Sequence, residues 1–314
     1  MKNLMRAIVF GTAVGDALGV PVEFVGRKHL TINPVVSMRG YGTHKQPAGT
    51  WSDDTSLLLA IVDGIKDGYD LNKIAQNFVA WYEKAEFTAH NEVFDAGMTT
   101  VLGINNIKAG VQPLTHCGAV HDGSQGNGSV MRTLALVPLV KELPIDLRYR
   151  IVTEVSSLTH AHINCQFASF FLVEYAITLF DCKDKINFGM SQLTALILTQ
   201  EKIRTFISQN PTLIPNLAPF NRILGPFEGV KEENISGSGY VISTLEASIW
   251  CLINSKSYSE AVLKAVNLGD DTDTTGAVTG GLAAILYGIE SIPSDWMTEL
   301  ANKYLLNKIC DGYN

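Results

Sequence analysis

Two acid-rich stretches, far apart in the chain, constrain its fold more than any other feature of the sequence. In the stretch 269–276 (GDDTDTTG), three carboxylates and three hydroxyls fill the consecutive positions 270–275, and 52–55 (SDDT) is a shorter stretch of the same kind. Carboxylates and hydroxyls are hard oxygen donors, which suit Mg²⁺, Mn²⁺ or Ca²⁺ rather than zinc or copper. We therefore predict that the fold brings both stretches together around two divalent cations.

Helix capping is the alternative explanation for the same residues. Asp, Ser and Thr are preferred at helix N-termini, where negative charge is also favourable, so either stretch alone could be a helix start. A cap needs one side-chain oxygen, whereas each stretch offers three or more. Asp271 and Asp273 are two positions apart, so both carboxylates can point to one side of a non-helical turn. Paired acidic clusters are what a two-metal site requires, which favours metal binding.

Length and charge narrow the class of protein. A chain of 314 residues with 46% hydrophobic content can bury a large core. We predict one domain, residues 1–314, because a boundary between Asp53 and Asp271 would leave their shared site in an interface. The net charge of −7 and the absence of Lys or Arg runs argue against nucleic acid or an anionic membrane as partner. The sequence does not define the oligomeric state, and a monomer is the expectation.

Cysteine usage and hydropathy predict a cytoplasmic location. The five cysteines are an odd number without CxxC spacing, as expected for reduced thiols. The first fifteen residues resemble a signal peptide, but Asp16 closes the apolar run early and no convincing cleavage site precedes it. No apolar stretch is expected to reach the ~18 residues of a membrane span.

The dominant hydrophobic period is helical. It predicts helices at residues 3–19, 55–68, 71–83, 91–109, 129–141, 146–158, 162–180, 190–209, 238–254, 257–267, 273–288 and 294–306. Three long loops, 34–50, 110–128 and 210–239, separate them. Loops of this length in a compact domain are usually functional or mobile.

Glycines recur at a spacing of four in two of these helices. Gly11, Gly15 and Gly19 share one face of the first, and Gly276 and Gly280 share a face of the helix after the second acid-rich stretch. Each glycine in a helix interior costs about 1 kcal/mol, so glycines in register need a reason. We predict that helix backbones approach closely at these faces near the centre of the molecule.

Further polar residues are candidates for the same site. Residues 126–129 (GNGS) precede an apolar helix and could present free backbone N–H groups to a phosphate, although a plain turn fits as well. Glu23 and Asp16 could act as a general base or orient metal ligands, or be solvated acids. We interpret His160 as a substrate contact and assign His162 to capping or the surface, since no third soft ligand is near for zinc.

Six sequence blocks together resemble the ADP-ribosylglycohydrolase family, which includes the dinitrogenase reductase activating glycohydrolase and the ADP-ribosylarginine hydrolases. They follow family order and span nearly the whole chain: Gly15-Asp16-Ala17-Leu18-Gly19 with Glu23, Ser52-Asp53-Asp54-Thr55, Gly126-Asn127-Gly128-Ser129-Val130-Met131-Arg132, Thr159-His160, Gly239-Tyr240-Val241 with Thr244-Leu245, and Asp271-Thr272-Asp273-Thr274. Ser52 replaces a usual Thr and keeps the hydroxyl, whereas Asp270 replaces a usual Gly and adds a carboxylate.

The resemblance implies an all-α fold, a compact orthogonal bundle of about a dozen helices with a binuclear metal centre in a central ADP-ribose cleft. The metal ligands that it implies for two Mg²⁺ or Mn²⁺ ions are Ser52, Asp53, Asp54, Asp271, Asp273 and Thr274. The substrate-binding residues are Gly126, Asn127, Gly128 and Ser129 at the diphosphate, with His160 and Tyr240. The catalytic residues are Glu23, beside the scissile ribose, Asp53 and Asp271.

The implied activity is metal-dependent hydrolysis that removes mono-ADP-ribose from modified proteins, with arginine as the favoured linkage. Water would attack ribose C1 through an oxocarbenium-like transition state that nearby carboxylates stabilise. The alternatives are hydrolysis of serine-linked or O-acetyl ADP-ribose, hydrolysis of a nucleotide phosphoester, and ADP-ribose binding without catalysis. Both acid-rich stretches are intact, which favours an enzyme over a binding protein.

Overall fold

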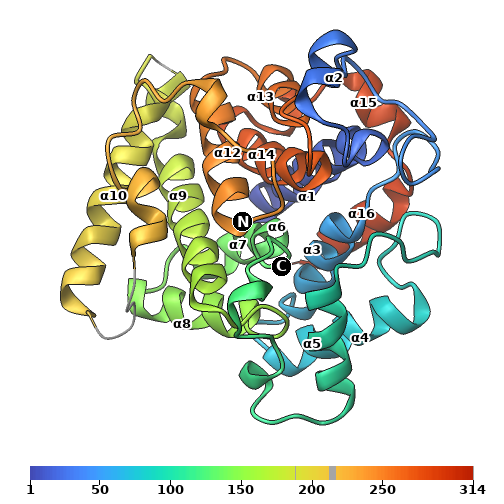
Figure 1. The fold of residues 1–314 in the computed structure, drawn as a ribbon. Coiled ribbons are helices and arrows are strands. Elements are labelled where there is room, and N and C mark those ends of the chain that lie inside the picture. The colour runs from blue at the N-terminus through green and yellow to red at the C-terminus, as the bar shows by residue number, and fades with distance from the viewer. Residues whose placement is uncertain (188, 212–216, 314) are drawn as a thin grey trace.

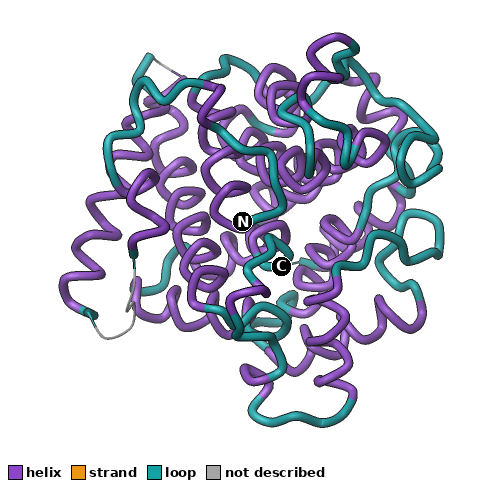
Figure 2. Tube along the Cα trace, viewed as in Figure 1, coloured by secondary structure: helices purple, strands orange, loops and turns teal. Residues whose placement is uncertain are grey.

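The computed structural model describes residues 1–187, 189–211 and 217–313, and in these ranges the chain forms helices and no strand (Figures 1 and 2). The predicted all-α class is therefore confirmed. The α-helices are α1 (Lys2–Gly19), α2 (Arg27–Ile32), α3 (Asp53–Gly64), α4 (Leu71–Lys84), α5 (Met98–Lys108), α6 (Val130–Thr133), α7 (Val137–Val140), α8 (Ile145–Ser156), α9 (Ile163–Asn187), α10 (Gln192–Gln209), α11 (Asn221–Leu224), α12 (Val241–Ile253), α13 (Tyr258–Val266), α14 (Thr272–Tyr287), α15 (Ser294–Glu299) and α16 (Lys303–Gly312).

The core is organised around α1 and α14, which pack against each other along their glycine faces. A Cβ added at Gly15 would lie 2.1 Å from the carbonyl oxygen of Gly276, and one added at Gly280 would lie 2.2 Å from the carbonyl oxygen of Gly11. These pairs run in opposite directions along the two helices, so the helices are antiparallel. The predicted close approach of the two glycine faces is confirmed.

This approach sets the position of the second acid-rich stretch. A Cβ at Gly19 would lie 2.3 Å from the Cα of Asp273, so the end of α1 touches the start of α14. There the Thr272 hydroxyl donates to the carbonyl oxygen of Gly19 at 2.8 Å. Because α1 and α14 are buried along nearly their whole length, the carboxylates at this junction lie inside the protein.

The other helices cover this pair on different sides (Figure 1). The helices α12 and α13 pack on α14, and α9 contacts both α12 and α14. On the left of the view, α8 and α10 flank α9, whereas α4 and α5 lie at lower right, where α4 packs on α3. The helix α3, which carries the first acid-rich stretch, also contacts α1 and α14. The two stretches thus start helices that meet in the core.

The starts of α3 and α14 test the capping alternative. Ser52 is the N-cap of α3, and its hydroxyl oxygen accepts the backbone N–H of Asp54 at 3.2 Å. Asp271 occupies the same position before α14, but its side chain makes no capping hydrogen bond. Capping therefore accounts for the Ser52 hydroxyl and for Asp273 Oδ1, which accepts the backbone N–H of Thr274 at 2.9 Å, but not for the other carboxylate oxygens of the two stretches.

The predicted helix boundaries were wrong in several places, and the helix expected at 162–180 extends to Asn187. The helix expected at 91–109 begins only at Met98, and residues 91–97 form a loop in which Asn91 and Asp95 have left-handed backbone angles. The helix expected at 294–306 is broken into α15 and α16, with Asn302 left-handed between them. The short helices α2 and α11 lie in regions read as loops, since four to six residues carry too little periodicity to detect.

The expectation that no apolar stretch reaches membrane-spanning length was also wrong. Residues 2–22 and 163–186 are long and apolar enough, by length and composition, to cross a membrane. Within the fold, however, 94% and 83% of these windows are buried against other helices. Their hydropathy is accounted for by the core, because a helix that is apolar all round is buried on all sides.

We expect Gly15→Ala to destabilise the protein by at least about 1–3 kcal/mol, the usual cost of overpacking a core, because the new methyl group would meet the backbone of α14. Urea unfolding followed by circular dichroism measures the change. Gly26→Ala is the matched control, since a Cβ there meets nothing within 4 Å and the φ of −67° suits alanine. Equal stability of the two variants would contradict the close packing of α1 and α14.

Candidate functional site

Residues 126–129 (GNGS) are called the glycine loop below. A cavity of about 240 Å³ opens where α3, α14 and the glycine loop converge. Its wall combines acidic side chains with glycines and an imidazole. The predicted site residues that line it are Glu23, Asp53, Gly126, Asn127, Gly128, His160, Asp271 and Thr274. Residues from the beginning, middle and end of the sequence therefore share one cavity.

Asp16 on α1 holds the first acid-rich stretch in place. Its carboxylate is fully buried and accepts the backbone N–H of Ser52 at 2.9 and 3.1 Å, one distance to each oxygen. It also accepts the backbone N–H of Thr55 at 3.1 Å and the Thr55 hydroxyl at 2.6 Å. Burial raises the pKa of Asp16 to about 7, and these donors oppose the rise. Asp16 thus orients the start of α3, one of the two roles that the sequence left open.

The second stretch is oriented by two segments outside α14. The backbone N–H of Asp271 donates to the carbonyl oxygen of Gly237 at 2.9 Å. The Asn127 side-chain amide donates to Asp271 Oδ2 at 2.9 Å and to the Thr244 hydroxyl at 2.9 Å. Asn127 therefore joins the glycine loop to the acid-rich start of α14.

The two stretches meet through their carboxylates. One oxygen from each of Asp16, Asp54 and Asp273 lies within 4.8 Å of the others, and the same holds for Glu23, Asp271 and Asp273. Asp273 belongs to both groups, so the two groups are adjacent. Distances of this order between carboxylate oxygens allow them to bind a common cation.

Several of these carboxylate oxygens are buried without a partner. Asp54 Oδ1, Asp271 Oδ1 and Asp273 Oδ2 have no hydrogen bond in the described part of the chain. Burial raises the pKa of all three carboxyls, and neighbouring acids raise those of Asp54 and Asp273 further. A buried carboxylate without a partner is costly, because the charge loses its hydration without compensation. These residues therefore fit divalent cations, which would supply the missing charge.

Glu23 also belongs to a third group, with His44 and Asp95, which the sequence did not predict. The Glu23 carboxylate is hydrogen bonded to His44 Nε2, and Asp95 Oδ1 lies 4.0 Å from the same nitrogen. The His44 ring packs against Phe94 and Phe24 at centroid distances of 5.3 and 6.2 Å. Burial raises the pKa of Glu23 to about 7, and the bond to His44 opposes the rise. The hydrogen bond to Glu23 raises the pKa of His44 in turn.

The sequence carried little signal for His44 and Asp95. His44 lies in the long loop 34–50, which length alone marked as functional, and Asp95 lies in a segment expected to be helical. Asp95 has a φ of +55°, and Phe24, the residue after Glu23, has a φ of +63°. Left-handed angles at bulky or acidic residues are uncommon and cluster at functional sites. Only the folded chain shows them.

The glycine loop has the free backbone groups that a phosphate would need. The N–H of Asn127 donates to the carbonyl oxygen of Gly239 at 3.1 Å, and Gly126 forms an isolated β-bridge with Tyr240. The N–H groups of Gly126 and Gly128, in contrast, donate to no acceptor among the residues that the structure describes. Free N–H groups beside a cavity bind anions.

The remaining predicted residues lie around the cavity rather than in its wall. Ser52, Asp54 and Asp273 are 1% exposed and lie behind the wall with the unpartnered oxygens. The Ser129 side chain is fully buried, and its oxygen accepts the Ser169 hydroxyl at 3.2 Å. Tyr240 is 38% exposed on the outer side of the bridge to Gly126.

The two histidines of the predicted site differ in environment. His160 is 2% exposed and lines the cavity, and its role as a substrate contact stays a prediction. His162 accepts the backbone N–H of Asn164 at 3.1 Å near the start of α9, which is the capping role expected for it.

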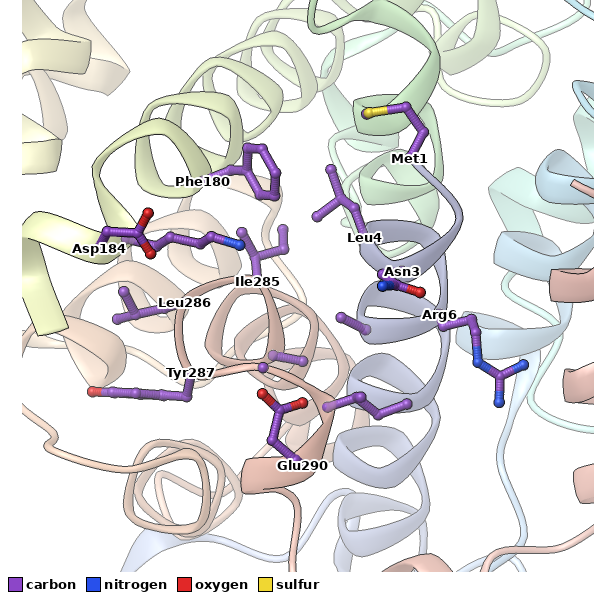
Figure 3. Close-up of a pocket in the computed structure, with 15 residues that line it drawn as sticks. Met1, Asn3, Leu4, Arg6, Phe180, Asp184, Ile285, Leu286, Tyr287 and Glu290 are labelled. Atoms are coloured by element: carbon purple, nitrogen blue, oxygen red, sulfur yellow. The ribbon is translucent and has the colours of Figure 1, made fainter. Parts of the chain in front are cut away.

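A larger hollow, of about 540 Å³, lies elsewhere in the molecule (Figure 3). Met1 and Leu4 approach it from the start of α1, Phe180 and Asp184 from α9, and Ile285 to Tyr287 from the end of α14. None of its described lining residues is a predicted site residue. The carboxylates thus gather at the smaller cavity, and chemistry rather than size identifies it as the candidate site.

Comparisons with known proteins identify the family of the chain. The sequence profile of the ADP-ribosylglycohydrolase family matches residues 1–313. The ADP-ribosylarginine hydrolase Tri1 of Serratia proteamaculans is 29% identical, over 98% of this chain and 77% of its own length. The ADP-ribosyl-[dinitrogen reductase] glycohydrolase of Rhodospirillum rubrum is 24% identical, over 93% and 88%. A solved structure titled ADP-ribosylglycohydrolase-related protein complex superposes with a TM-score of 0.78 and 26% identity, over 99% of this chain and 97% of that one.

The raised pKa values predict how the stability of the cation-free protein depends on pH. Asp16 and Glu23 have pKa values of about 7 in the folded protein, against 3.8 and 4.5 when unperturbed, so between these limits the folded state binds more protons than the unfolded state. Stability must then fall as pH rises, by about 1.4 kcal/mol per pH unit for each extra proton. Urea unfolding in chelator between pH 5.5 and 7.5 measures the slope.

Excess Mn²⁺ is the control for this prediction. Cation binding requires deprotonated carboxylates, so it should weaken or reverse the loss of stability with rising pH. A stability that increases from pH 5.5 to 7.5 in chelator would show that these acids are not held protonated by burial.

Proposed function

The chain belongs to the ADP-ribosylglycohydrolase family, and from this premise we propose that it removes single ADP-ribose groups from arginine side chains of proteins in a reaction that requires divalent cations. It is a hydrolase of glycosidic bonds, like the named relatives. The proposal adds the linkage, the cations and the residues that act.

The meeting of the two acid-rich stretches is the observation that carries the proposal. Three buried carboxylate oxygens lack a partner: Asp271 lines the cavity together with Glu23, and Asp54 and Asp273 lie behind its wall. A binding protein without catalysis has no use for this many costly buried acids. A hydrolase that passes through an oxocarbenium-like transition state needs carboxylates at the sugar.

We propose that two Mg²⁺ or Mn²⁺ ions are held by Ser52, Asp53, Asp54, Asp271, Asp273 and Thr274. Two observations support this ligand set: the hard oxygen donors, and the unpartnered oxygens that cations would satisfy. When bound, such ions supply Lewis acidity and neutralise the acids around the substrate. Asp16 orients this ligand set through Ser52 and Thr55.

Glu23 is the proposed general base. It lines the cavity, and its pKa of about 7 is close to that of an effective base at neutral pH. His44 holds the carboxylate by a hydrogen bond, which fixes its direction. Glu23 would take a proton from the attacking water while Asp53 and Asp271, in the same wall, stabilise positive charge on the ribose.

The glycine loop is the proposed diphosphate site, with His160 beside it. The free N–H groups of Gly126 and Gly128 support this role. Tyr240 is joined to Gly126 through the backbone bridge, and its proposed role is to contact a more distant part of ADP-ribose. Ser129 would support the loop from within through its bond with Ser169.

Charge supports arginine as the linkage. The cavity wall combines Glu23, Asp53, Asp95 and Asp271, and a guanidinium group is a cation that such a wall attracts. Two relatives are named for ADP-ribosylarginine hydrolysis.

We further propose a cytoplasmic location, because all five cysteines are free and buried. The proposed partner is a mono-ADP-ribosylated protein, with no nucleic acid or membrane.

Removal of cations or carboxylates should abolish hydrolysis. We expect chelator to stop release of ADP-ribose from ADP-ribosylarginine and Mg²⁺ or Mn²⁺ to restore it. Glu23→Gln and Asp271→Asn should each lower kcat by about 10²-fold or more. Chromatography of the products measures the rate. Glu290→Gln, in the hollow of Figure 3, is the matched control and should retain full activity.

The products also distinguish the alternatives. Free ADP-ribose and unmodified arginine support the glycohydrolase, whereas AMP or inorganic phosphate would identify a phosphoesterase. Full turnover by Glu23→Gln would show that another carboxylate is the general base. Full activity in chelator would show that the reaction does not require divalent cations.

The acidic wall predicts a preference among linkages. We expect kcat/KM for an arginine-linked substrate to exceed that for a serine-linked one, or for O-acetyl-ADP-ribose, by at least tenfold, which is about 1.4 kcal/mol of transition-state stabilisation. Asp95→Asn should reduce this ratio, because it removes charge from the wall. A faster rate on the serine-linked substrate would contradict the proposed linkage.

A further inference from the structure

We propose that Arg132 and Thr159 act as positioning residues which hold His160 in a single tautomer, with its hydrogen on Nε2, so that the ring donates a hydrogen bond to a phosphate oxygen in the cavity. The inference rests on the proposed function for the identity of the ligand. The tautomer itself follows from buried hydrogen bonds alone.

Arg132 is the fixed donor at one end of the chain of bonds. Its side chain is fully buried, and its guanidinium lies 4.7 Å above the centre of the Phe78 ring. Nη1 donates to the carbonyl oxygen of Gly128 at 2.5 Å, and Nη2 donates to the Thr159 hydroxyl oxygen at 2.6 Å. A guanidinium has no acceptor, so the direction of both bonds is certain.

The Thr159 hydroxyl must donate a hydrogen bond to His160. The Thr159 side chain is fully buried, and its hydroxyl lies 2.8 Å from His160 Nδ1. Within the described residues the hydroxyl forms hydrogen bonds only with this nitrogen and with Arg132 Nη2. An undonated hydroxyl hydrogen at a buried position would cost free energy. Nδ1 is therefore the acceptor.

The state of His160 follows from this bond. Burial and the nearby Arg132 charge lower the pKa of His160 to about 3, so the ring is neutral at physiological pH. A neutral imidazole carries one hydrogen, and an accepting Nδ1 places it on Nε2. The backbone is held as well: the His160 N–H donates to the Ser156 carbonyl at 2.8 Å, and the Ser156 hydroxyl donates to the His160 carbonyl at 2.9 Å.

The Nε2 side of the ring faces the glycine loop. A Cβ at Gly126 would lie 3.7 Å from His160 Nε2, and one at Gly128 would lie 2.6 Å from Cε1 and 3.1 Å from Nε2. His160 also lines the cavity. An Nε2–H here supplements the free N–H groups of the loop and attracts an oxygen that only accepts, such as a phosphate oxygen. The opposite tautomer would present a lone pair and repel it.

Long-range ¹⁵N–¹H correlation spectra of the wild-type protein test the tautomer directly. We expect the His160 signals, identified by their loss in His160→Gln, to show a protonated Nε2 and an unprotonated Nδ1. Thr159→Val should remove this preference, and Thr159→Ser, which keeps the hydroxyl, should retain it. A wild-type ring protonated on Nδ1 would overturn the proposal, and this measurement needs no variant of Thr159 to fold.

Calorimetric titration with ADP-ribose tests the consequence for binding. Thr159→Val should weaken the affinity by about tenfold or more, as expected when one hydrogen bond to a charged group is lost, and Thr159→Ser should bind like the wild type. An altered tautomer with unchanged affinity would overturn the role in phosphate binding. A wild-type protein that does not bind ADP-ribose would overturn the proposed function, while the spectra would still decide the tautomer.

Discussion

The close contact of two antiparallel helices through their glycine faces is the constraint on which the rest of the structure depends. With no Cβ at Gly11, Gly15 and Gly19, α1 lies against α14 at a distance that no other residue allows. The same contact brings Gly19 onto the backbone of Asp273 and places Asp16 where it holds the start of α3. The helix packing thus assembles the acid-rich site, so that a loss of glycine would affect both stability and chemistry.

The site concentrates acidic side chains in the centre of a largely apolar core. Backbone N–H groups and the amide of Asn127 satisfy some carboxylate oxygens, but those of Asp54, Asp271 and Asp273 retain one unpartnered atom each. These unpartnered atoms lower the stability of the folded state, and a bound cation would offset that loss through electrostatic attraction. The glycine loop, with its free N–H groups, and a neutral histidine line the same cavity and favour an anion. A sugar attached to a diphosphate could use both kinds of group.

The sequence predicted some features of the fold and of the site and missed others, as particular residues show. The glycine spacing predicted close backbone approach at each of the two faces, because a stripe of residues on a helix is a local property, and the structure shows that the faces meet each other. The acid-rich stretches were recognised by residue type, and the structure brings Asp54 and Asp273 together. His44 and Asp95 were missed because each is a single residue in irregular backbone, without a period or a neighbouring motif. Ser129 matched a motif, yet its side chain points into the core, since a motif does not specify direction.

The sequence by itself determined the helical class, the family and the kinds of donor in the site, because period, ordered motifs and residue chemistry are all local. Only the tertiary structure decided which oxygens lack a partner, which histidine nitrogen carries the hydrogen, and that Glu23 is held by His44. These properties depend on burial and on contacts between residues far apart in the chain. Burial removes water, and the nearest neighbours then decide where charges and hydrogens lie.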